Sequence, residues 1–445
     1  MSDRDDIVIT GVGLASPVGT SAESTFAALL AGAAIGDHAR VDDANGVASH
    51  WGDAAEQRLA NLGHHVAIEA LGRSGWSDST LADARTALIV GTSKGPADDW
   101  LLPINDGLHP PTSDNQQCED VTSTTTIANN WITRFNTSVA IAPARPIKSS
   151  RPVVEPGNLL GLHVICEALA NRLGIGIGPR LTFSAACASS LHALIRAAML
   201  LQHGDADRAI VVGAESSLHP AFIQSFKRLG VIANVGEPCR PMDRNRSGFL
   251  ISEAAAAICL ERRPARAGEI VLDGWAIGAD ASHLTHTNPD AATLRHCIST
   301  VLAARPVDLV HAHCTGTVAN DVLELAAIEA CLTGANALAA EAASPVEPNP
   351  GLPLEWPAER HECPVIYSHK GAIGHSLGAS GLVATVINVM SQRAGVVPGN
   401  VNTIDPLPTP AGRIESRAVE GTVRRSIAIA AGFGGATGVV GLRTV

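Results

Sequence analysis

Aromatic residues are scarce in this sequence: they occupy 3% of its 445 positions, and tyrosine occurs once. The hydrophobic core must therefore be built mainly from alanine, valine, leucine and isoleucine. No apolar run reaches the ~18 residues that a membrane span requires. Residues 2–6 are polar and acidic, so the chain does not open like a secretory leader. These absences predict a cytoplasmic protein without a membrane segment.

Positive charge is also in short supply, with 32 Lys and Arg against 43 Asp and Glu and a formal net charge of −11. Such a chain is not expected to bind nucleic acid through its general charge. Nine cysteines are scattered without a C-x-x-C pair, which favours free thiols in a reducing compartment over a disulfide framework. Nucleotide signatures are missing as well. Gly11 and Gly13 are not followed by the third glycine of a dinucleotide fingerprint, and no Gly-Lys-Ser/Thr phosphate loop occurs.

What the sequence does contain is an alternation of short apolar strands and helical segments. The strands lack polar alternation, which is typical of sheets buried on both faces in α/β proteins. We expect strands at 6–11, 86–91, 181–183, 209–215, 270–280, 309–312, 365–367, 426–431 and 439–443. We expect helices at 24–30, 54–71, 158–173, from 189 onward, and at 222–228, 293–304, 321–332 and 382–390.

The rhythm of strand, glycine turn and helix has a similar length in two halves of the chain, which suggests a duplicated unit. The composition changes near 264–268, so we expect an N-terminal half, 1–265, and a C-terminal half, 266–445. Residues 92–154 predict long loops around a short helix near 127–131, and residues 336–361 predict a surface insertion.

The stretch from Thr182 to Leu201 predicts a strand, a tight turn of small residues and a helix, with Cys187 at the helix start. The unpaired N–H groups of a helix N-terminus favour a thiolate, so we expect the pKa of Cys187 to be lowered. The small neighbours leave room for a ligand at the sulfur. Cys187 is therefore a candidate nucleophile, and the alternative is an inert core cysteine.

A second candidate region places His313 at the end of a strand, where α/β sheets open their crevices. Asn320 or Asp321 is expected to cap the following helix, which carries Glu324. The alternative is a structural histidine.

A third region, 368–381, holds Lys370 and His375 among four glycines. A lysine buried there would need a carboxylate partner, for which Glu324 is a candidate. A fourth, 432–435, sets Phe433 among three glycines and predicts a hinge or gate, or simply core filling.

Cys187, His313 and His375 form a conceivable set of zinc ligands, but no closely spaced ligand pair supports a metal site, and we expect none. A thiol with two imidazoles suits acyl chemistry better. A thiolate can take an acyl group from a thioester, and imidazole N–H groups can stabilise an enolate as a carboxylate leaves as CO2.

Taken in order, these motifs resemble the β-ketoacyl-acyl-carrier-protein synthases of the thiolase superfamily, of the elongating type. The matching pieces are IVITGVGLASPVG, AACASSLHAL, VVGAESS, CRPMDRNRSGFLISEAAA, HCTGTVANDVLE, KGAIGHSLGASG and GFGG. The resemblance covers essentially the whole chain. It implies a five-layered α-β-α-β-α fold of two duplicated halves with mixed sheets, and a homodimer.

The resemblance also implies roles for individual residues. Cys187 corresponds to the acyl-carrying nucleophile, and His313 and His375 correspond to the pair that promotes malonyl decarboxylation. Lys370 corresponds to the electrostatic lysine paired with Glu324, near Asp321 as structural support. Thr315 and Thr317 correspond to the threonines that line the phosphopantetheine arm. Phe433 and Gly434 correspond to the turn that gates the site and contributes to the oxyanion hole.

The implied reaction is a decarboxylative Claisen condensation of an acyl group on Cys187 with malonyl-carrier protein, in fatty-acid-type elongation. Partners would be acyl carrier protein and its acyl and malonyl thioesters; the phosphopantetheine arm arrives with the carrier, so no cofactor of its own is expected. Lys227 with Arg228, or Arg240 with Arg244, are candidates for a basic rim that meets the acidic carrier; the alternative, which is the favoured one for any single residue, is scattered solvated charge.

The chain departs from the family pattern at Cys314, where the family usually has glycine, and at Ala431 and Ala436 beside the GFGG turn. These departures, with segments 92–154 and 336–361, leave acyl length and pathway open. One alternative is a ketosynthase of a specialised polyketide, polyene or unusual-lipid pathway. Another is a non-catalytic partner that sets chain length, against which the presence of Cys187 argues.

Overall fold

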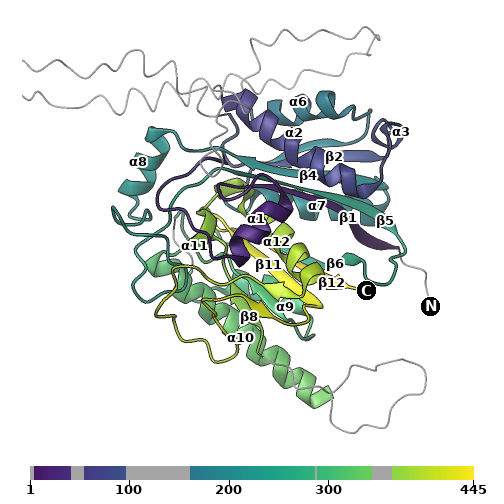
Figure 1. Cartoon of the computed structure of the whole chain (residues 1–445). Coiled ribbons are helices and arrows are strands. Elements are labelled where there is room, and N and C mark those ends of the chain that lie inside the picture. The colour runs from purple at the N-terminus through teal and green to yellow at the C-terminus, as the bar shows by residue number, and fades with distance from the viewer. Residues whose placement is uncertain (1–4, 42–54, 97–160, 286–287, 343–362) are drawn as a thin grey trace, which may run out of the picture. The chain divides into compact units, whose positions relative to one another are not determined.

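The computed structural model describes residues 5–41, 55–96, 161–285, 288–342 and 363–445, which belong to one compact unit (Figure 1). A ten-stranded mixed sheet and the helices that pack on it make up most of this unit. Within these ranges, no helix combines the length and the apolar character needed to cross a membrane.

The strands of the large sheet follow the order β3-β2-β4-β5-β1-β6-β12-β11-β7-β8. Their bounds are β1 Asp6–Ala15, β2 Thr86–Gly91, β3 Arg180–Phe183, β4 Arg208–Glu215, β5 Ala254–Arg263, β6 Ile270–Ala279, β7 Leu309–His311, β8 Val365–Tyr367, β11 Arg425–Ala431 and β12 Ala436–Thr444. A separate ribbon pairs β9, Val396–Val397, with β10, Val419–Glu420.

The order and direction of the strands repeat in the two halves of the chain. In the first half, β2 runs parallel to β3 and β4, and β5 is antiparallel to β4 and β1. In the second half, β7 runs parallel to β8 and β11, and β12 is antiparallel to β11 and β6. Each half therefore has the same strand order from its outer edge to the junction of β1 with β6, where Val8 pairs with Val271. The duplication suggested by the sequence is visible in this topology.

Helices cover both faces of the sheet and also fill the space between its two halves (Figure 1). α2 (Ala55–Ser74) and α6 (Val164–Leu173) pack on the outer face of the first half, and α9 (Ala292–Leu302) and α10 (Val318–Ala342) pack on that of the second. α7 (Ser189–His203) and α12 (Ser380–Ala394) contact strands of both halves. Three helical layers thus enclose two half-sheets, which is the α-β-α-β-α arrangement expected from the sequence.

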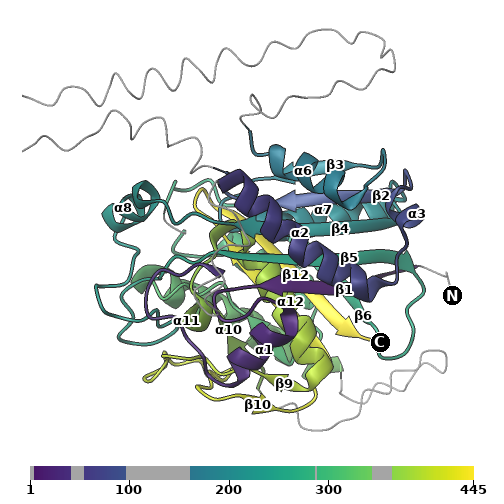
Figure 2. The same cartoon turned by 45° about the horizontal axis from the view of Figure 1, so that its top comes forward.

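The remaining helices lie at the margins of these layers. They are α1 Ala22–Leu30, α3 Asp78–Leu81, α8 Pro220–Arg228 and α11 Lys370–Ile373. α1 packs against both α12 and β1 (Figure 2). Its N-terminus is closed by Ser21 and Ser24, whose side chains each accept a hydrogen bond from the other residue's backbone N–H.

The apolar side chains of a strand point alternately to its two faces, so each strand packs into two hydrophobic cores. Along β4, Ala209 and Val211 pack into the central layer, whereas Ile210 and Val212 pack toward α2 and α6. Because both faces are covered, every second residue on either side is apolar, and the strand reads as a continuous hydrophobic run. This explains why the sequence shows no polar alternation in its strands.

The strands and helices expected from the sequence are present wherever the structure describes them, with shifts of a few residues at their ends. The insertion expected from residue 336 is wrong at its start, because α10 continues to Ala342 through an alanine-rich stretch with high helix propensity. The capping role expected for Asn320 or Asp321 is also wrong, since α10 already begins at Val318. The helix expected near 127–131 and most of 92–154 lie outside the described residues.

A buried charge network joins strands of the second half. Asp273 on β6 accepts hydrogen bonds from Arg425, at 2.6 Å, and from Arg305 and Arg443. The Arg425 guanidinium also donates to backbone carbonyl oxygens of Val301 and Leu302 at the end of α9. The charge of Arg425, 3% exposed, therefore depends on one carboxylate for compensation.

We expect Asp273→Asn to lower the free energy of unfolding by about 3–5 kcal/mol, because it leaves the buried Arg425 charge uncompensated. Urea unfolding followed by circular dichroism measures the change. Asp405→Asn, which breaks the exposed ion pair with Arg244, is the control and should cost at most about 1 kcal/mol. Equal effects of the two variants would contradict the importance of the Asp273 network.

Candidate active site

The turn that carries Cys187 connects the end of β3 to the start of α7. Ala186 has a positive φ of 49°, which is an uncommon conformation for alanine and indicates a sharp, constrained turn. Ser189, the first residue of α7, supports it: its Oγ accepts a hydrogen bond from the backbone N–H of Ala185 and donates one to the carbonyl oxygen of Ala186. Cys187 is thereby fixed one residue before the helix N-cap, as the sequence predicts.

The 432–435 turn lies directly against the Cys187 turn. A Cβ added at Gly432 would sit 2.8 Å from the carbonyl oxygen of Ala185 and 3.1 Å from the backbone nitrogen of Cys187, so only glycine fits there. Gly434 has φ of +82° and donates its N–H to the carbonyl oxygen of Leu284. The Phe433 side chain is 37% exposed, and its ring lies 6.4 Å from that of Phe226, so the ring is not core filling.

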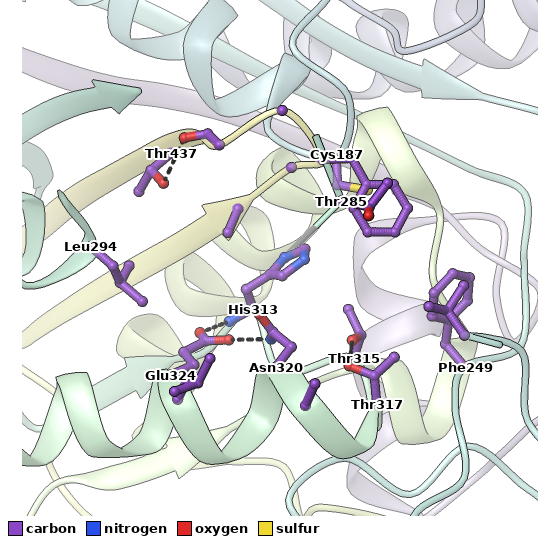
Figure 3. Close-up of a pocket in the computed structure, with 18 of the residues that line it drawn as sticks. Cys187, Phe249, Thr285, Leu294, His313, Thr315, Thr317, Asn320, Glu324 and Thr437 are labelled. Carbon is purple, nitrogen blue, oxygen red and sulfur yellow. Dashed lines mark hydrogen bonds between the residues drawn. The ribbon is translucent and has the colours of Figure 1, made fainter. Parts of the chain in front are cut away.

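His313 follows the end of β7 and is held through its backbone. Its N–H donates to Oε1 of Glu324 at 2.5 Å, and the other oxygen of this carboxylate accepts from the side-chain amide of Asn320 (Figure 3). The imidazole of His313 projects away from Glu324 into the cavity (Figure 3). Glu324 therefore positions the backbone and leaves the ring of His313 free for other partners.

His375 is fixed by the strand-like segment that precedes β5. Its backbone N–H donates to the carbonyl oxygen of Leu250, and its carbonyl oxygen accepts from the N–H of Ser252. The ring of Phe249 meets the imidazole edge-on, with 5.1 Å between ring centroids. Phe249 thus sets the orientation of the His375 ring, a role that sequence reasoning missed although the residue lies in the GFLISEAAA motif.

Cys187, His313 and His375 meet in one place. The Sγ atom of Cys187 lies 3.1 Å from Nε2 of His375, and the two imidazole rings are 5.4 Å apart. One side-chain atom from each of the three residues lies within 4.8 Å of the others. All three line a cavity of about 360 Å³, shown in Figure 3. A thiol from the first half of the chain therefore shares one space with two imidazoles from the second.

The expected lowering of the pKa of Cys187 is wrong. Burial raises the pKa of this thiol to about 11, and the positive charges of Lys94 and Lys370 oppose that shift without overcoming it. Burial, with the charge of Lys370, also lowers the pKa of both His313 and His375 well below the ordinary value. At neutral pH the site thus holds a neutral thiol and neutral imidazoles.

Lys370 is fully buried beside these groups, at the start of α11. Burial lowers its pKa, and the charge of Glu324 raises it. The direct ion pair expected between Lys370 and Glu324 is absent from the described residues, since the carboxylate oxygens are taken by His313 and Asn320. Burial, with the nearby charge of Asp321, raises the pKa of Glu324 to about 7. The two groups interact electrostatically across the site without touching.

Thr315 and Thr317 lie side by side on the cavity wall, with 3.1 Å between their hydroxyl oxygens. Asp321 supports this segment from below by accepting hydrogen bonds from the backbone N–H groups of Thr315 and Gly316. Because the carboxylate reaches back from the first turn of α10, it fixes the loop rather than capping the helix.

Two of the three departures noted in the sequence, Ala431 and Cys314, occupy different places around the cavity. Ala431 lines the cavity next to the 432–435 turn. Cys314 is fully buried, and its carbonyl oxygen accepts a hydrogen bond from the hydroxyl of Ser368 at 2.8 Å. Cys314 therefore belongs to the framework that joins β7 to the segment after β8, and its thiol faces no open space.

Lys94 is a further charged group near the sulfur that sequence reasoning missed. Its Nζ lies 5.4 Å from the ring centroid of Phe222 and 5.7 Å from that of Phe226, which lines the cavity. Among the charged neighbours of Cys187, Lys94 lowers the pKa of the thiol the most. A GTSKG stretch following a buried strand was the available signal, because turns at the ends of such strands face the crevice.

The three site atoms would also suit three positions of a tetrahedral zinc site, because a thiolate and two imidazoles are common zinc ligands. The expectation of no metal therefore stays a prediction.

Comparison with known proteins shows which sequence family the two halves of the chain match. Sequence models described as "Beta-ketoacyl synthase, N-terminal domain" and "Beta-ketoacyl synthase, C-terminal domain" match residues 54–265, and residues 270–345 and 356–403, respectively. The first model ends, and the second begins, next to the expected division of the chain at 265/266, which itself stays a prediction.

Individual relatives are more distant. The 3-oxoacyl-acyl-carrier-protein synthase 2 of Mycobacterium bovis is 30% identical over 235 residues, or 49% of this chain and 50% of that protein. The chain thus spans about half the length of the mycobacterial relatives that it matches. The enzyme of the same name from Coxiella burnetii is 26% identical over 433 residues, which cover 91% of this chain and 90% of that one.

Solved structures show the same fold. The ishigamide ketosynthase/chain length factor has a TM-score of 0.73 at 22% identity, covering 99% of this chain and 100% of that chain. The ketosynthase ApeO, in complex with its chain length factor ApeC from Xenorhabdus doucetiae, has a TM-score of 0.71 at 20% identity, covering 99% and 98%. Fold and site define a thiolase-type protein with a cysteine and two histidines. By its sequence match over both domains, the chain belongs to the β-ketoacyl synthase family.

The raised pKa of Cys187 predicts how its reactivity depends on pH. Because the thiolate fraction grows about tenfold per pH unit below the pKa, the rate of alkylation by iodoacetamide should rise steadily from pH 7 to about pH 10. Intact-mass spectrometry measures the rate, and Cys187→Ala supplies the background from other thiols. A plateau below pH 8 would show that the thiol is ionised in the free protein.

Proposed function

We propose that the protein catalyses a decarboxylative Claisen condensation of an acyl thioester, held on Cys187, with malonyl-carrier protein. The observation that carries this proposal is the meeting of the Cys187 sulfur with the imidazoles of His313 and His375 in one cavity. The reaction needs a nucleophile for the acyl group and donors for an enolate oxygen, and these three side chains supply both. Membership of the family supports the same reaction.

In the first half-reaction, the Cys187 sulfur attacks the carbonyl carbon of the acyl thioester while its proton passes to Nε2 of His375, 3.1 Å away. The backbone N–H groups of Cys187 and Phe433 hold the oxyanion that forms, since their turns lie against each other at Gly432. The carrier thiolate then leaves and takes the proton from His375. The thiol is neutral before attack, so proton acceptance by a neutral imidazole is required.

In the second half-reaction, the malonyl group on the arm of its carrier protein enters past Thr315 and Thr317, which line the cavity that holds the sulfur. The carboxylate leaves as CO2, and the electron pair of the broken bond forms an enolate whose oxygen accepts hydrogen bonds from His313 and from His375, once the ring proton of His375 has moved from Nδ1 to Nε2. Its carbon attacks the acyl thioester, the Cys187 thiolate leaves, and a proton from solvent, passed on by His375, returns the sulfur to its neutral thiol. The product is a β-ketoacyl-carrier protein.

The partners in this proposal are acyl carrier protein and a second copy of the chain in a homodimer. Arg240 and Arg244 each pair with a neighbouring carboxylate, whereas Lys227 and Arg228 are exposed at the end of α8, so the latter pair is the better rim for an acidic carrier. We propose that the phosphopantetheine arm comes with the carrier and that no metal acts, because an ion on Sγ would block acylation. A cytoplasmic location fits the eight free cysteines among the described residues.

One observation favours the specialised pathway over ordinary fatty-acid elongation. The Lys94 ammonium group lies over two phenylalanine rings, one of them on the cavity wall, and has no ion-pair partner among the described residues. Lys94 does not line the cavity itself, so it acts through its field from behind Phe226: a positive charge there favours an acyl chain that carries oxygen over a saturated one. The proposal of a non-catalytic partner receives no such support, since nucleophile and histidines are present together.

We expect Cys187→Ser to abolish acyl transfer and condensation. We expect His313→Ala to slow the decarboxylation of malonyl-carrier protein about 10²–10³-fold, because one enolate donor is lost, and to change acyl transfer to Cys187 far less. Intact-mass measurement follows acylation, and release of labelled CO2 follows decarboxylation. Normal decarboxylation by His313→Ala would refute its assigned role, and failure of acyl thioesters to modify Cys187 in the wild type would refute the proposed function.

For Lys94, we expect the wild type to acylate Cys187 faster with a 3-oxo-octanoyl thioester than with octanoyl thioester. Lys94→Met should reduce this preference about tenfold, the value of a charged hydrogen bond of roughly 1.4 kcal/mol. Arg424→Met removes an exposed positive charge elsewhere and should keep the preference. A preference that is unchanged in Lys94→Met would remove the support for a specialised substrate.

A further inference from the structure

A second pair of histidines lies buried next to the proposed catalytic residues. His311 precedes His313 by two positions on β7, and His369 directly precedes Lys370; both are 0% exposed. Nε2 of His311 lies 2.8 Å from Nδ1 of His369, and the rings are 5.0 Å apart. Neither histidine lines the cavity, so neither can touch a substrate there.

The pair is part of a chain of hydrogen bonds that ends on α12. Nδ1 of His311 lies 2.8 Å from Oδ1 of Asn388, and Nε2 of His369 lies 3.3 Å from the hydroxyl of Ser380. The Nδ2 amide of Asn388 in turn donates to the carbonyl oxygen of Ile427 on β11. Four side chains thus connect β7, the segment after β8, and the first residue and the middle of α12.

These contacts determine which atom donates in each bond. Asn388 must accept with Oδ1 because its amide already donates to Ile427, so Nδ1–H of His311 is the donor. Nε2 of the neutral His311 is then an acceptor, and Nδ1–H of His369 donates to it. Nε2 of His369 is left to accept the hydroxyl proton of Ser380. Every polar atom of the two imidazoles is satisfied only in this one arrangement of protons.

Protonation of either His311 or His369 would break this set of hydrogen bonds. A proton added to Nε2 of His311 would face the N–H of His369, and a proton added to Nε2 of His369 would face the hydroxyl proton of Ser380 and lie close to the charge of Lys370. Burial and Lys370 accordingly lower the pKa of both groups. The chain of bonds is therefore a fixed neutral brace, distinct in role from the imidazoles that face the cavity.

We propose that His311 and His369 are positioning residues, which set the placement of His313 and Lys370 for the decarboxylation step. The brace links the two segments that carry these residues, whereas Cys187 belongs to a separate turn in the first half of the chain. Its loss should therefore disturb the malonyl half-reaction more than acyl transfer. This inference rests on the proposed function.

A matched pair of variants at His369 tests the proposal. Asparagine can place an N–H near the position of Nδ1, and leucine has the same shape without the donor. We expect His369→Leu to slow CO2 release from malonyl-carrier protein about tenfold or more, because small displacements of positioned groups are costly. Acylation of Cys187, measured by intact mass, should change less than about twofold by the same reasoning, and His369→Asn should recover most of the decarboxylation.

Equal losses in both half-reactions, or equal losses in the leucine and asparagine variants, would overturn the proposal. Should His369→Leu fail to fold, Ser380→Ala removes only the terminal hydroxyl and should show the same imbalance at about threefold; Ser380→Ala with no imbalance would also overturn it. A wild-type protein that acylates Cys187 but never releases CO2 would instead refute the proposed function.

Discussion

The contact between the N-terminal ends of α7 and α12 is the constraint on which the site depends. The hydroxyl of Ser190 accepts a hydrogen bond from the backbone N–H of Leu382 at 3.0 Å. A Cβ at Gly381 would come within 3.0 Å of the Cβ of Leu191, so glycine allows the two helices to approach. Cys187 lies two residues before α7, and His375 lies five residues before α12, ahead of the short 3-10 helix Leu377–Ala379; this approach brings sulfur and imidazole together.

The packing of α7 against α12 also determines the pKa values of the groups at the ends of these helices. The helices lie in the central layer of the protein, so the groups at their ends are buried between two half-sheets. Desolvation then outweighs the field of one helix N-terminus on Cys187, as the raised pKa of its thiol shows. Two positive charges outside the cavity lining, those of Lys94 and Lys370, act on the thiol and oppose the rise of its pKa.

The duplicated topology explains why the two histidines come from one half and Cys187 from the other. In each half, a turn after a parallel strand faces the shared central layer. The first half uses that position for Cys187 after β3, and the second uses it for His313 after β7 and His375 beyond β8. The buried His311–His369 brace belongs only to the second half, where three segments must be held in register at once.

The sequence by itself determined the class of fold and named the candidate site residues that the structure brings together. Apolar strands without alternation can only be buried on both faces, and glycine-dense turns after strands mark where backbones meet closely, as at Gly432. Local pattern therefore predicted the α/β architecture and singled out Cys187, His313 and His375.

Only the tertiary structure decided how these residues behave, because pKa and pairing depend on neighbours that are far apart in the chain. It placed Glu324 on the backbone of His313 rather than on Lys370, and it raised the pKa of the Cys187 thiol that a helix N-terminus alone would lower. Asp321 supports the loop of Thr315 instead of capping the helix. Long-range packing also places Lys94, Phe249 and the His311–His369 pair near the site. Burial and long-range contact are properties of the packed layers, and no local spacing encodes them.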